Sequence, residues 1–160
     1  MYKKILGCLA GAAAGDAMGA ATETRTRKQI AELFGGYVTD FLAPPADTFA
    51  RGSRAGQVTD DFSVAYVTLQ EIVNRKRIDE ETAVAALLKW AAVPEYFDRF
   101  AGPTTRARVL ELQGKKAGSD EFVPVNDNNK ATNGAAMKAA PIALLSRGDV
   151  DAAIDQAVTV

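Results

Sequence analysis

Apolar residues recur every three to four positions along most of this chain, and no convincing stretch alternates apolar and polar residues as a strand would. The clearest stripe lies between Thr59 and Arg75 and consists of Phe62, Ala65, Tyr66, Leu69, Ile72 and Val73. This spacing places side chains on one face of an α-helix, whereas a half-buried strand needs a period of two. Because 160 residues are enough for one domain with a core, we predict an all-α fold.

Capping residues, prolines and glycines divide the rest of the chain into further helices. The predicted helical segments are 24–36, 79–94, 102–118, 131–148 and 149–160. Thr26 and Asp79 are placed to cap two of these helices, and Asp149 or Asp151 to cap the last. Pro94 is expected to end its helix, and Pro141 to interrupt or kink the helix over 131–148. Residues 37–56 and 119–130 are predicted to be loops.

Four glycines follow a strict four-residue spacing in an apolar run near the N-terminus: Gly7, Gly11, Gly15 and Gly19. On a helix they form one smooth stripe. Since each glycine costs a helix roughly 1 kcal/mol relative to alanine, the stripe predicts tight tertiary packing or backbone kept close to a ligand. The run resembles an export signal, but Asp16 interrupts it before the roughly 20 residues that span a bilayer. We predict a buried helix of a soluble protein.

The residue types that are missing exclude several kinds of active site. The sequence has no histidine, which excludes a Ser-His-Asp triad, a Cys-His pair and a His-ligated zinc or haem. The single cysteine, Cys8, cannot form an internal disulfide, so we expect a cytoplasmic protein. A net charge of -1 gives no electrostatic reason to expect a nucleic acid or an anionic membrane as partner. Catalysis would use carboxylates, hydroxyls, amides, Lys or Arg, with or without a hard cation.

The stretch "VTDD" places a hydroxyl, Thr59, and two carboxylates, Asp60 and Asp61, at the start of a predicted helix. One interpretation is structural, because Thr59 is a good cap and the helix dipole favours acids in the first turn. The other is chemical, because adjacent carboxylates repel each other unless a divalent cation lies between them. An oxygen-only ligand set fits Mg²⁺, Ca²⁺ or Mn²⁺ better than zinc. The spacing alone favours the structural interpretation.

Two other stretches carry candidate polar groups. Asp16 and Glu23 lie seven positions apart, so on a continuous helix they would project from the same side. Spacing favours a buried hydrogen-bonding Asp16 and a solvated Glu23 over a role for Glu23 at the edge of a cleft. In "ATNGAAMKAAP", Asn133 can cap a helix, and Gly134 would let backbone amides approach an anion. Met137 is a core residue on this interpretation.

Four motifs occur in an order that is similar to that of a known protein family. "GCLAGAAAGDAMGAATE", "GQVTDD", "AGPTTR" and "ATNGAAMKAAP" resemble the ADP-ribosylglycohydrolase family, which includes dinitrogenase reductase-activating glycohydrolase and the ADP-ribosylarginine and ADP-ribosylserine hydrolases. The resemblance covers most of the chain, and four ordered motifs are far more specific than one. It implies an all-α fold with a two-metal centre, usually Mg²⁺ and sometimes Mn²⁺, in a cleft that binds ADP-ribose.

The resemblance also implies roles for single residues. Thr59, Asp60 and Asp61 match the family's first metal-ligand motif, and Glu23 matches an acidic residue implicated in gating or catalysis. Glu23 or one of the two aspartates would then transfer protons as the catalytic carboxylate.

The substrate pocket is implied by the later motif. Asn133, Gly134 and Met137 match the stretch that lines the ADP-ribose pocket. Lys138 stands where the family commonly has Arg, so a bidentate contact with phosphate is not carried over to this position.

The family's second ligand motif, Asp-x-Asp followed by Ser or Thr, does not occur downstream of these motifs within residues 1–160. The last predicted helix also ends in apolar residues, which indicates a buried terminus or, as we expect, a longer protein. Residues 1–160 would then be the N-terminal part of a single all-α domain, with the C-terminal remainder of the fold as partner. Because Mg²⁺ requires near-octahedral oxygen coordination, we expect the isolated chain to be inactive or metal-poor.

The resemblance implies a hydrolase that removes ADP-ribose from a modified protein side chain or a small molecule by cleaving the glycosidic bond at ribose C1″. The motifs suit Arg-, Ser- and small-molecule-linked ADP-ribose alike. The alternative hypothesis is an inactive homologue that binds ADP-ribose or a nucleotide, or that has a structural role.

Overall fold

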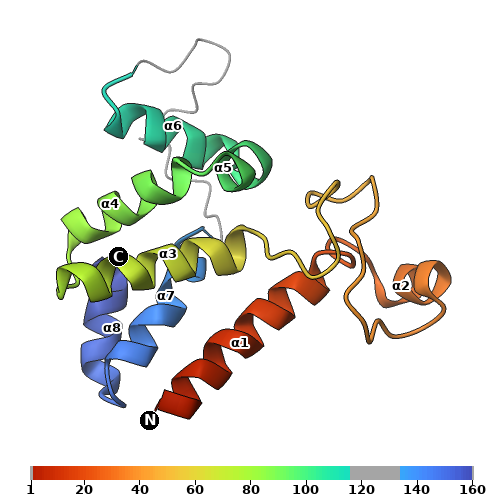
Figure 1. Cartoon of the computed structure of the whole chain (residues 1–160), viewed down its shortest axis with the longest axis horizontal. Helices are drawn as coiled ribbons and strands as arrows, with labels where there is room; N and C mark the ends of the chain where they lie inside the picture. The colour runs from red at the N-terminus through yellow and green to blue at the C-terminus, as the bar shows by residue number, and fades with distance from the viewer. Residues whose placement is uncertain (1, 116–133, 160) are drawn as a thin grey trace. The chain divides into compact units, whose positions relative to one another are not determined.

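The computed structural model describes residues 2–115 and 134–159. These residues form helices and turns without any strand, which confirms the all-α prediction (Figure 1). The helices are α1 (Tyr2–Gly19), α2 (Arg27–Phe34), α3 (Asp60–Arg75), α4 (Glu80–Ala91), α5 (Pro94–Phe100), α6 (Pro103–Leu112), α7 (Gly134–Leu145) and α8 (Val150–Thr159).

Local capping signals account for several helix starts. Thr26 and Gln29 form a reciprocal capping box at the start of α2. The side chain of Asp79 accepts the backbone N–H of Thr82 at 2.8 Å at the start of α4. At α8 the cap is Asp149, which accepts the N–H of Ala152 at 3.0 Å. Each of these predicted caps is therefore confirmed, and Asp149 is the one of its two candidates that caps α8.

Helix α4 ends before Pro94, as predicted, whereas the predicted interruption at position 141 is wrong. Pro94 follows the end of α4, but it also occupies the first turn of α5, a helix that we did not predict. The fixed φ of proline suits this position because the first-turn N–H has no partner within the helix. Position 141 lies inside α7, which continues through it to Leu145 and is not interrupted. The predicted loop over 119–130 lies outside the described residues.

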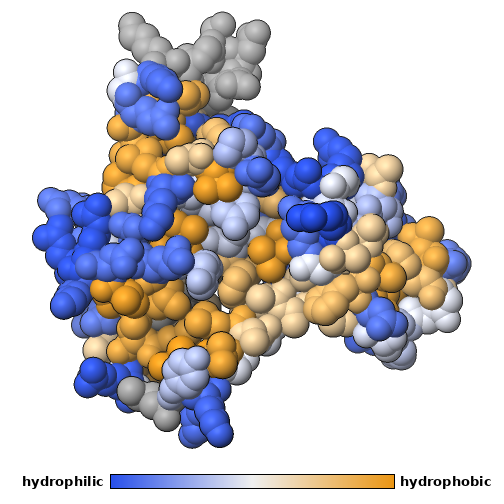
Figure 2. All heavy atoms as spheres, viewed as in Figure 1, coloured by the Kyte–Doolittle hydropathy of each residue, from blue (hydrophilic) through white to orange (hydrophobic). Residues whose placement is uncertain are grey.

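The chain divides into two compact units, Met1–Phe62 and Ser63–Val160. The first unit contains α1, α2 and the first residues of α3. Only Ala17 is buried along α1, and Figure 2 shows apolar atoms of this alanine-rich helix at the surface. The predicted burial of this helix is therefore wrong for the part of the chain that the structure describes. The buried residues Ala20 and Ala21 lie in the turn that follows it.

The glycine stripe of α1 is open. At all four glycines of the stripe, a Cβ atom added to the backbone would have no neighbour within 4 Å. Tight packing, one of the two explanations predicted for the stripe, is therefore wrong within the described residues. The other explanation, a ligand close to the backbone, remains a prediction.

The core of the second unit surrounds Trp90 of α4, which is 1% exposed. Its indole N–H donates to Ser63 Oγ at 2.8 Å, so the buried polar group has a partner. Tyr96 stacks on the indole with ring centroids 6.3 Å apart, and Phe97 meets it edge-on at 6.2 Å. These contacts explain why α4 packs against α5.

The helix pair α7 and α8 also belongs to the second unit. On α8, Val150, Ile154 and Val158 are exposed, and the terminal residue 160 lies outside the described residues. Among the helices described, none has both the length and the apolar character needed to cross a membrane.

Candidate metal centre

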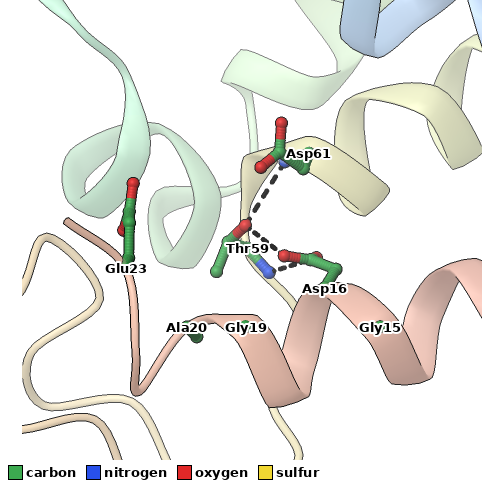
Figure 3. A pocket seen from close by; sticks show the side chains of 7 residues that line it. All are labelled: Gly15, Asp16, Gly19, Ala20, Glu23, Thr59 and Asp61. Carbon is green, nitrogen blue, oxygen red and sulfur yellow. Dashed lines mark hydrogen bonds between the residues drawn. The ribbon is translucent and has the colours of Figure 1, made fainter. Parts of the chain in front are cut away.

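A cavity of about 230 Å³ lies within the first unit, between the end of α1 and the start of α3 (Figure 3). Glycine and alanine backbone forms part of its wall, and acidic or hydroxyl side chains form the rest. The lining residues are Gly15, Asp16, Gly19, Ala20, Glu23, Thr59 and Asp61. The motifs "GDAMGAATE" and "VTDD" therefore meet at one site.

Asp16 joins these two motifs through three hydrogen bonds. Its Oδ1 accepts the Thr59 hydroxyl at 2.5 Å, and its Oδ2 accepts the Thr59 N–H at 2.7 Å and the Phe62 N–H at 3.3 Å. The backbone N–H groups at the start of a helix have no partner within the helix. The carboxylate of Asp16 satisfies two such groups at the start of α3, from a position 43 and 46 residues earlier in the chain.

The loop before Thr59 requires a glycine. Gly56 has a φ of +77°, in the left-handed region that other residues adopt at a cost. A Cβ atom at this position would lie 3.6 Å from the ring of Phe41, an ordinary van der Waals contact, so the backbone conformation and not the available space favours glycine. A glycine at position 56 therefore lets the chain turn and deliver Thr59, 7% exposed, to the wall of the cavity.

A tight turn after α1 carries Glu23 to the rim. Helix α1 ends at Gly19, so Glu23 is not on a continuous helix with Asp16 as the spacing suggested. The turn is held by the hydroxyl of Thr22, which donates to the Gly19 carbonyl at 3.1 Å. The next residue, Thr24, has a φ of 62°, which is strained for a β-branched side chain. Glu23 is exposed and lines the cavity together with Asp16.

Burial and neighbouring negative charges raise the pKa values of three carboxyl groups in this region. The pKa of Asp60 is raised to about 6, chiefly by burial and further by the charges of Asp61 and Asp16. Burial raises the pKa of Asp61, and the charge of Asp16 adds to this shift. Although Glu23 is exposed as a whole residue, partial burial raises the pKa of its carboxyl, and the charges of Asp61 and Asp16 add to this shift. Every charged neighbour that shifts these pKa values is therefore acidic.

The donor set suits a hard cation, although it is not a closed coordination shell. Its donors are carboxylate and hydroxyl oxygens, the ligands that Mg²⁺ and Mn²⁺ prefer. Within residues 2–115 and 134–159, no three acidic or cysteine side chains lie close enough together to hold a metal ion. The chemistry of the site thus fits a cation, while the described carboxylates do not form a complete site.

The predicted site residues are distributed as follows. Thr59, Asp61 and Glu23 line the same cavity, whereas Asp60 is half-buried and is not among its lining residues. Gly134 and Met137 lie in the first turn of α7, which belongs to the second unit. Asn133 lies outside the described residues.

Sequence reasoning gave Asp16 a hydrogen-bonding role but missed its partner and its place in the cavity wall. Its position between Gly15 and Gly19 is a usable signal, because small residues on either side leave room beside a polar side chain.

Comparisons with known proteins agree with this combination of fold and motifs. The family model described as ADP-ribosylglycohydrolase matches residues 1–160. The chain is 34% identical over 158 residues to the uncharacterized protein YegU of Escherichia coli (strain K12), in an alignment covering 96% of this chain and 45% of YegU. It is 31% identical over 145 residues to an uncharacterized protein of Archaeoglobus fulgidus, covering 91% of this chain and 44% of that protein. The chain thus spans less than half the length of these relatives, and it belongs to the ADP-ribosylglycohydrolase family.

Proposed function

We propose that this chain forms the N-terminal part of a Mg²⁺- or Mn²⁺-dependent hydrolase that cleaves the glycosidic bond at ribose C1″ of an ADP-ribosylated protein or small molecule. The observation that carries the proposal is the cavity in which Thr59 and Asp61 meet Asp16 and Glu23. Family membership supplies the reaction class. The pKa values of Glu23 and Asp61 are raised chiefly by burial and further by neighbouring acidic charges, so their ionised forms would gain from a nearby cation.

Thr59, Asp60 and Asp61 would hold the metal, and Asp60 would have to turn toward the cavity to do so. A bound divalent cation would orient the ribose hydroxyls and water and stabilise the charge that develops as the bond breaks. Burial raises the pKa of Asp60 and disfavours its ionised form. A positive charge beside Asp60 would lower this pKa again, so the carboxyl group would lose its proton more readily when the metal is bound.

Glu23 is the candidate acid–base group. It is an exposed residue that lines the cavity, so its carboxyl would be accessible to solvent and to a substrate bound there. Its raised pKa brings it closer to neutral pH, where a carboxyl group exchanges protons more effectively. It would accept the proton of the attacking water or return one to the departing side chain.

Gly15 and Gly19 give the site its open wall, since no atom lies within 4 Å of the positions that their Cβ atoms would occupy. Gly134, Met137 and Asn133 would contact ADP-ribose in this proposal. The C-terminal remainder of the fold would supply further oxygen ligands to the metal, and the relatives are long enough to contain such a part.

The test is release of ADP-ribose from an ADP-ribosylated protein, with Mg²⁺, with Mn²⁺ and with EDTA. The assay uses the chain alone and the chain fused to the part of YegU outside the matched region, because the relatives are more than twice as long. We expect release by the fusion with metal, loss of release with EDTA, and loss in the Asp60→Asn/Asp61→Asn variant. An active fusion that is indifferent to both EDTA and the substitutions would contradict the proposal. Binding of ADP-ribose without release would favour an inactive homologue.

A further inference from the structure

Asp16 uses most of its hydrogen-bonding capacity on the start of α3. A carboxylate offers about four acceptor sites, and three of those of Asp16 receive the Thr59 hydroxyl, the Thr59 N–H and the Phe62 N–H. Little capacity is left for direct coordination of a cation. Its strongest contacts hold Thr59, a neighbour in the cavity wall.

The hydrogen bond between the two side chains determines where the hydrogen of the Thr59 hydroxyl points. A hydroxyl group has one donor and two acceptor lone pairs. At Thr59 the donor is directed to Asp16 Oδ1 at 2.5 Å, and one lone pair is approached by the Asp61 N–H at 3.4 Å. The second lone pair stays available for another ligand. A hydroxyl that turned its hydrogen into the cavity would repel a cation there.

We propose that Asp16 is a positioning residue for the candidate metal site, which holds the Thr59 hydroxyl hydrogen so that an oxygen lone pair faces a cation in the cavity. This inference rests on the proposed function, because the cation belongs to that proposal. Asp16 acts through Thr59 and is not itself a ligand. Groups that orient a metal ligand in this way typically change metal affinity by about 10- to 100-fold when they are replaced.

The decisive substitution is Asp16→Asn. An amide has one acceptor oxygen, so it cannot accept both the Thr59 hydroxyl on one side and the two N–H groups on the other. If the amide oxygen keeps the N–H groups, its NH₂ group faces Thr59 Oγ1 and drives the hydroxyl hydrogen elsewhere. The variant therefore disturbs the hydroxyl while keeping the side-chain size. Circular dichroism confirms that each variant is folded.

The experiment is a double-mutant cycle read out by Mn²⁺ binding to the full chain, measured by electron paramagnetic resonance at concentrations that detect weak sites. We expect Asp16→Asn to weaken binding about 10-fold in the parent chain and in the Thr59→Ser background, which keeps the hydroxyl. In the Thr59→Val background, which lacks the hydroxyl, the same substitution should cost less than about 2-fold. Equal losses in all three backgrounds would overturn the inference and make Asp16 a ligand or a simple negative charge.

A metal-free measurement separates this inference from the proposed function. Hydrogen exchange of the Thr59 amide should be at least about 10-fold faster in Asp16→Ala than in the parent chain, because the N–H loses its acceptor. Unchanged exchange would show that Asp16 does not hold this residue and would overturn the inference. Absence of Mn²⁺ binding both to the parent chain and to its fusion with the part of YegU outside the matched region would instead contradict the metal site of the proposed function, and with it the role of Asp16.

Discussion

Asp60 shows the cost of a negative charge in this site before any cation binds. Its pKa is raised to about 6, above the ordinary value of 3.8, chiefly because burial disfavours the ionised carboxylate. A folded-state pKa above the unfolded value means that the folded chain binds the proton more tightly. The loss of folding stability caused by the ionised Asp60 carboxylate is therefore absent below about pH 4 and complete above about pH 6. Stability is lost as the pH rises through this window.

We predict that Asp60→Asn stabilises the metal-free chain at pH 7.5 by about 1 kcal/mol, a value reduced for partial exposure of the carboxylate. The gain should shrink toward zero at pH 4, where the parent carboxyl is protonated in both states. Urea unfolding at the two pH values measures the difference. Asp40→Asn, at an exposed loop position of the same unit, is the matched control and should change stability little. A variant that is less stable than the parent at pH 7.5 would contradict a desolvated charge at Asp60.

Residue-scale features were predictable where they depend on neighbours in sequence. Thr26, Asp79 and Asp149 act on N–H groups three positions downstream, so their capping roles follow from the local pattern. The partners Asp16 and Thr59 are 43 positions apart, and no local rule links them. Both motifs could therefore be identified from the sequence. The contact that Asp16 makes between them could be seen only in the folded structure.

At the scale of elements, α1 carries a glycine face whose purpose is testable. Gly15 lines the cavity and Gly11 does not, yet both lie in the same helix, and at either position an added Cβ atom would have no neighbour within 4 Å. We predict that each substitution to alanine raises stability by about 0.5–1 kcal/mol, since alanine is the better helix former. Only Gly15→Ala should weaken binding of ADP-ribose, by about 10-fold, because its methyl group enters the cavity.

Thermal unfolding and calorimetric titration with ADP-ribose, carried out on both variants, measure these effects. Equal affinities for ADP-ribose in Gly15→Ala and Gly11→Ala would show that this wall of the cavity does not face the ligand.

Helix α4 depends on a cap that the sequence identified. Asp79 accepts both the N–H and the hydroxyl of Thr82, and Thr82 is fully buried. We predict that Asp79→Ala lowers the free energy of unfolding, because a buried hydroxyl and a helix N–H lose their acceptor. Glu80→Ala, an exposed first-turn substitution, is the control and should cost less.

The stabilisation that the Asp79 cap provides should also depend on pH. Hydrogen bonds from Thr82 lower the pKa of Asp79, so its contribution to stability is complete above the ordinary value of 3.8 and is lost as the pH falls through the lower folded-state value. The stability difference between the parent and Asp79→Ala should therefore narrow in strong acid. A constant difference across this range would contradict an ionised cap.

The element-scale errors have identifiable causes. Pro94 was interpreted as a stop, but proline also fits the first turn of a helix, and α5 begins with it. The helix-period pattern predicted α1 correctly, yet glycine and alanine spacing cannot tell a packed face from an open one. The open glycine face is a property of the tertiary structure, in which an added Cβ meets nothing.

For the whole molecule, the proposed metal site is incomplete within this chain. The described acidic side chains do not form a three-carboxylate group, and the chain covers 45% of YegU. Magnesium prefers near-octahedral oxygen coordination, so affinity should increase when more ligands are available. We predict that the fusion with the remaining part of YegU binds Mg²⁺ at least about 10-fold more tightly than the chain alone, as measured by calorimetry. Equal affinities would show that the chain alone contains all the metal ligands that matter.

The central claim is that the cavity between α1 and the start of α3 holds a divalent cation. The most direct measurement is a crystal structure of the protein soaked in Mn²⁺, with an anomalous difference map calculated at a wavelength where manganese scatters strongly. The account predicts a peak inside this cavity, within coordination distance of Thr59 Oγ1 and a carboxylate oxygen of Asp61. A map with no peak in the cavity at saturating Mn²⁺, or with manganese bound only elsewhere, would contradict it.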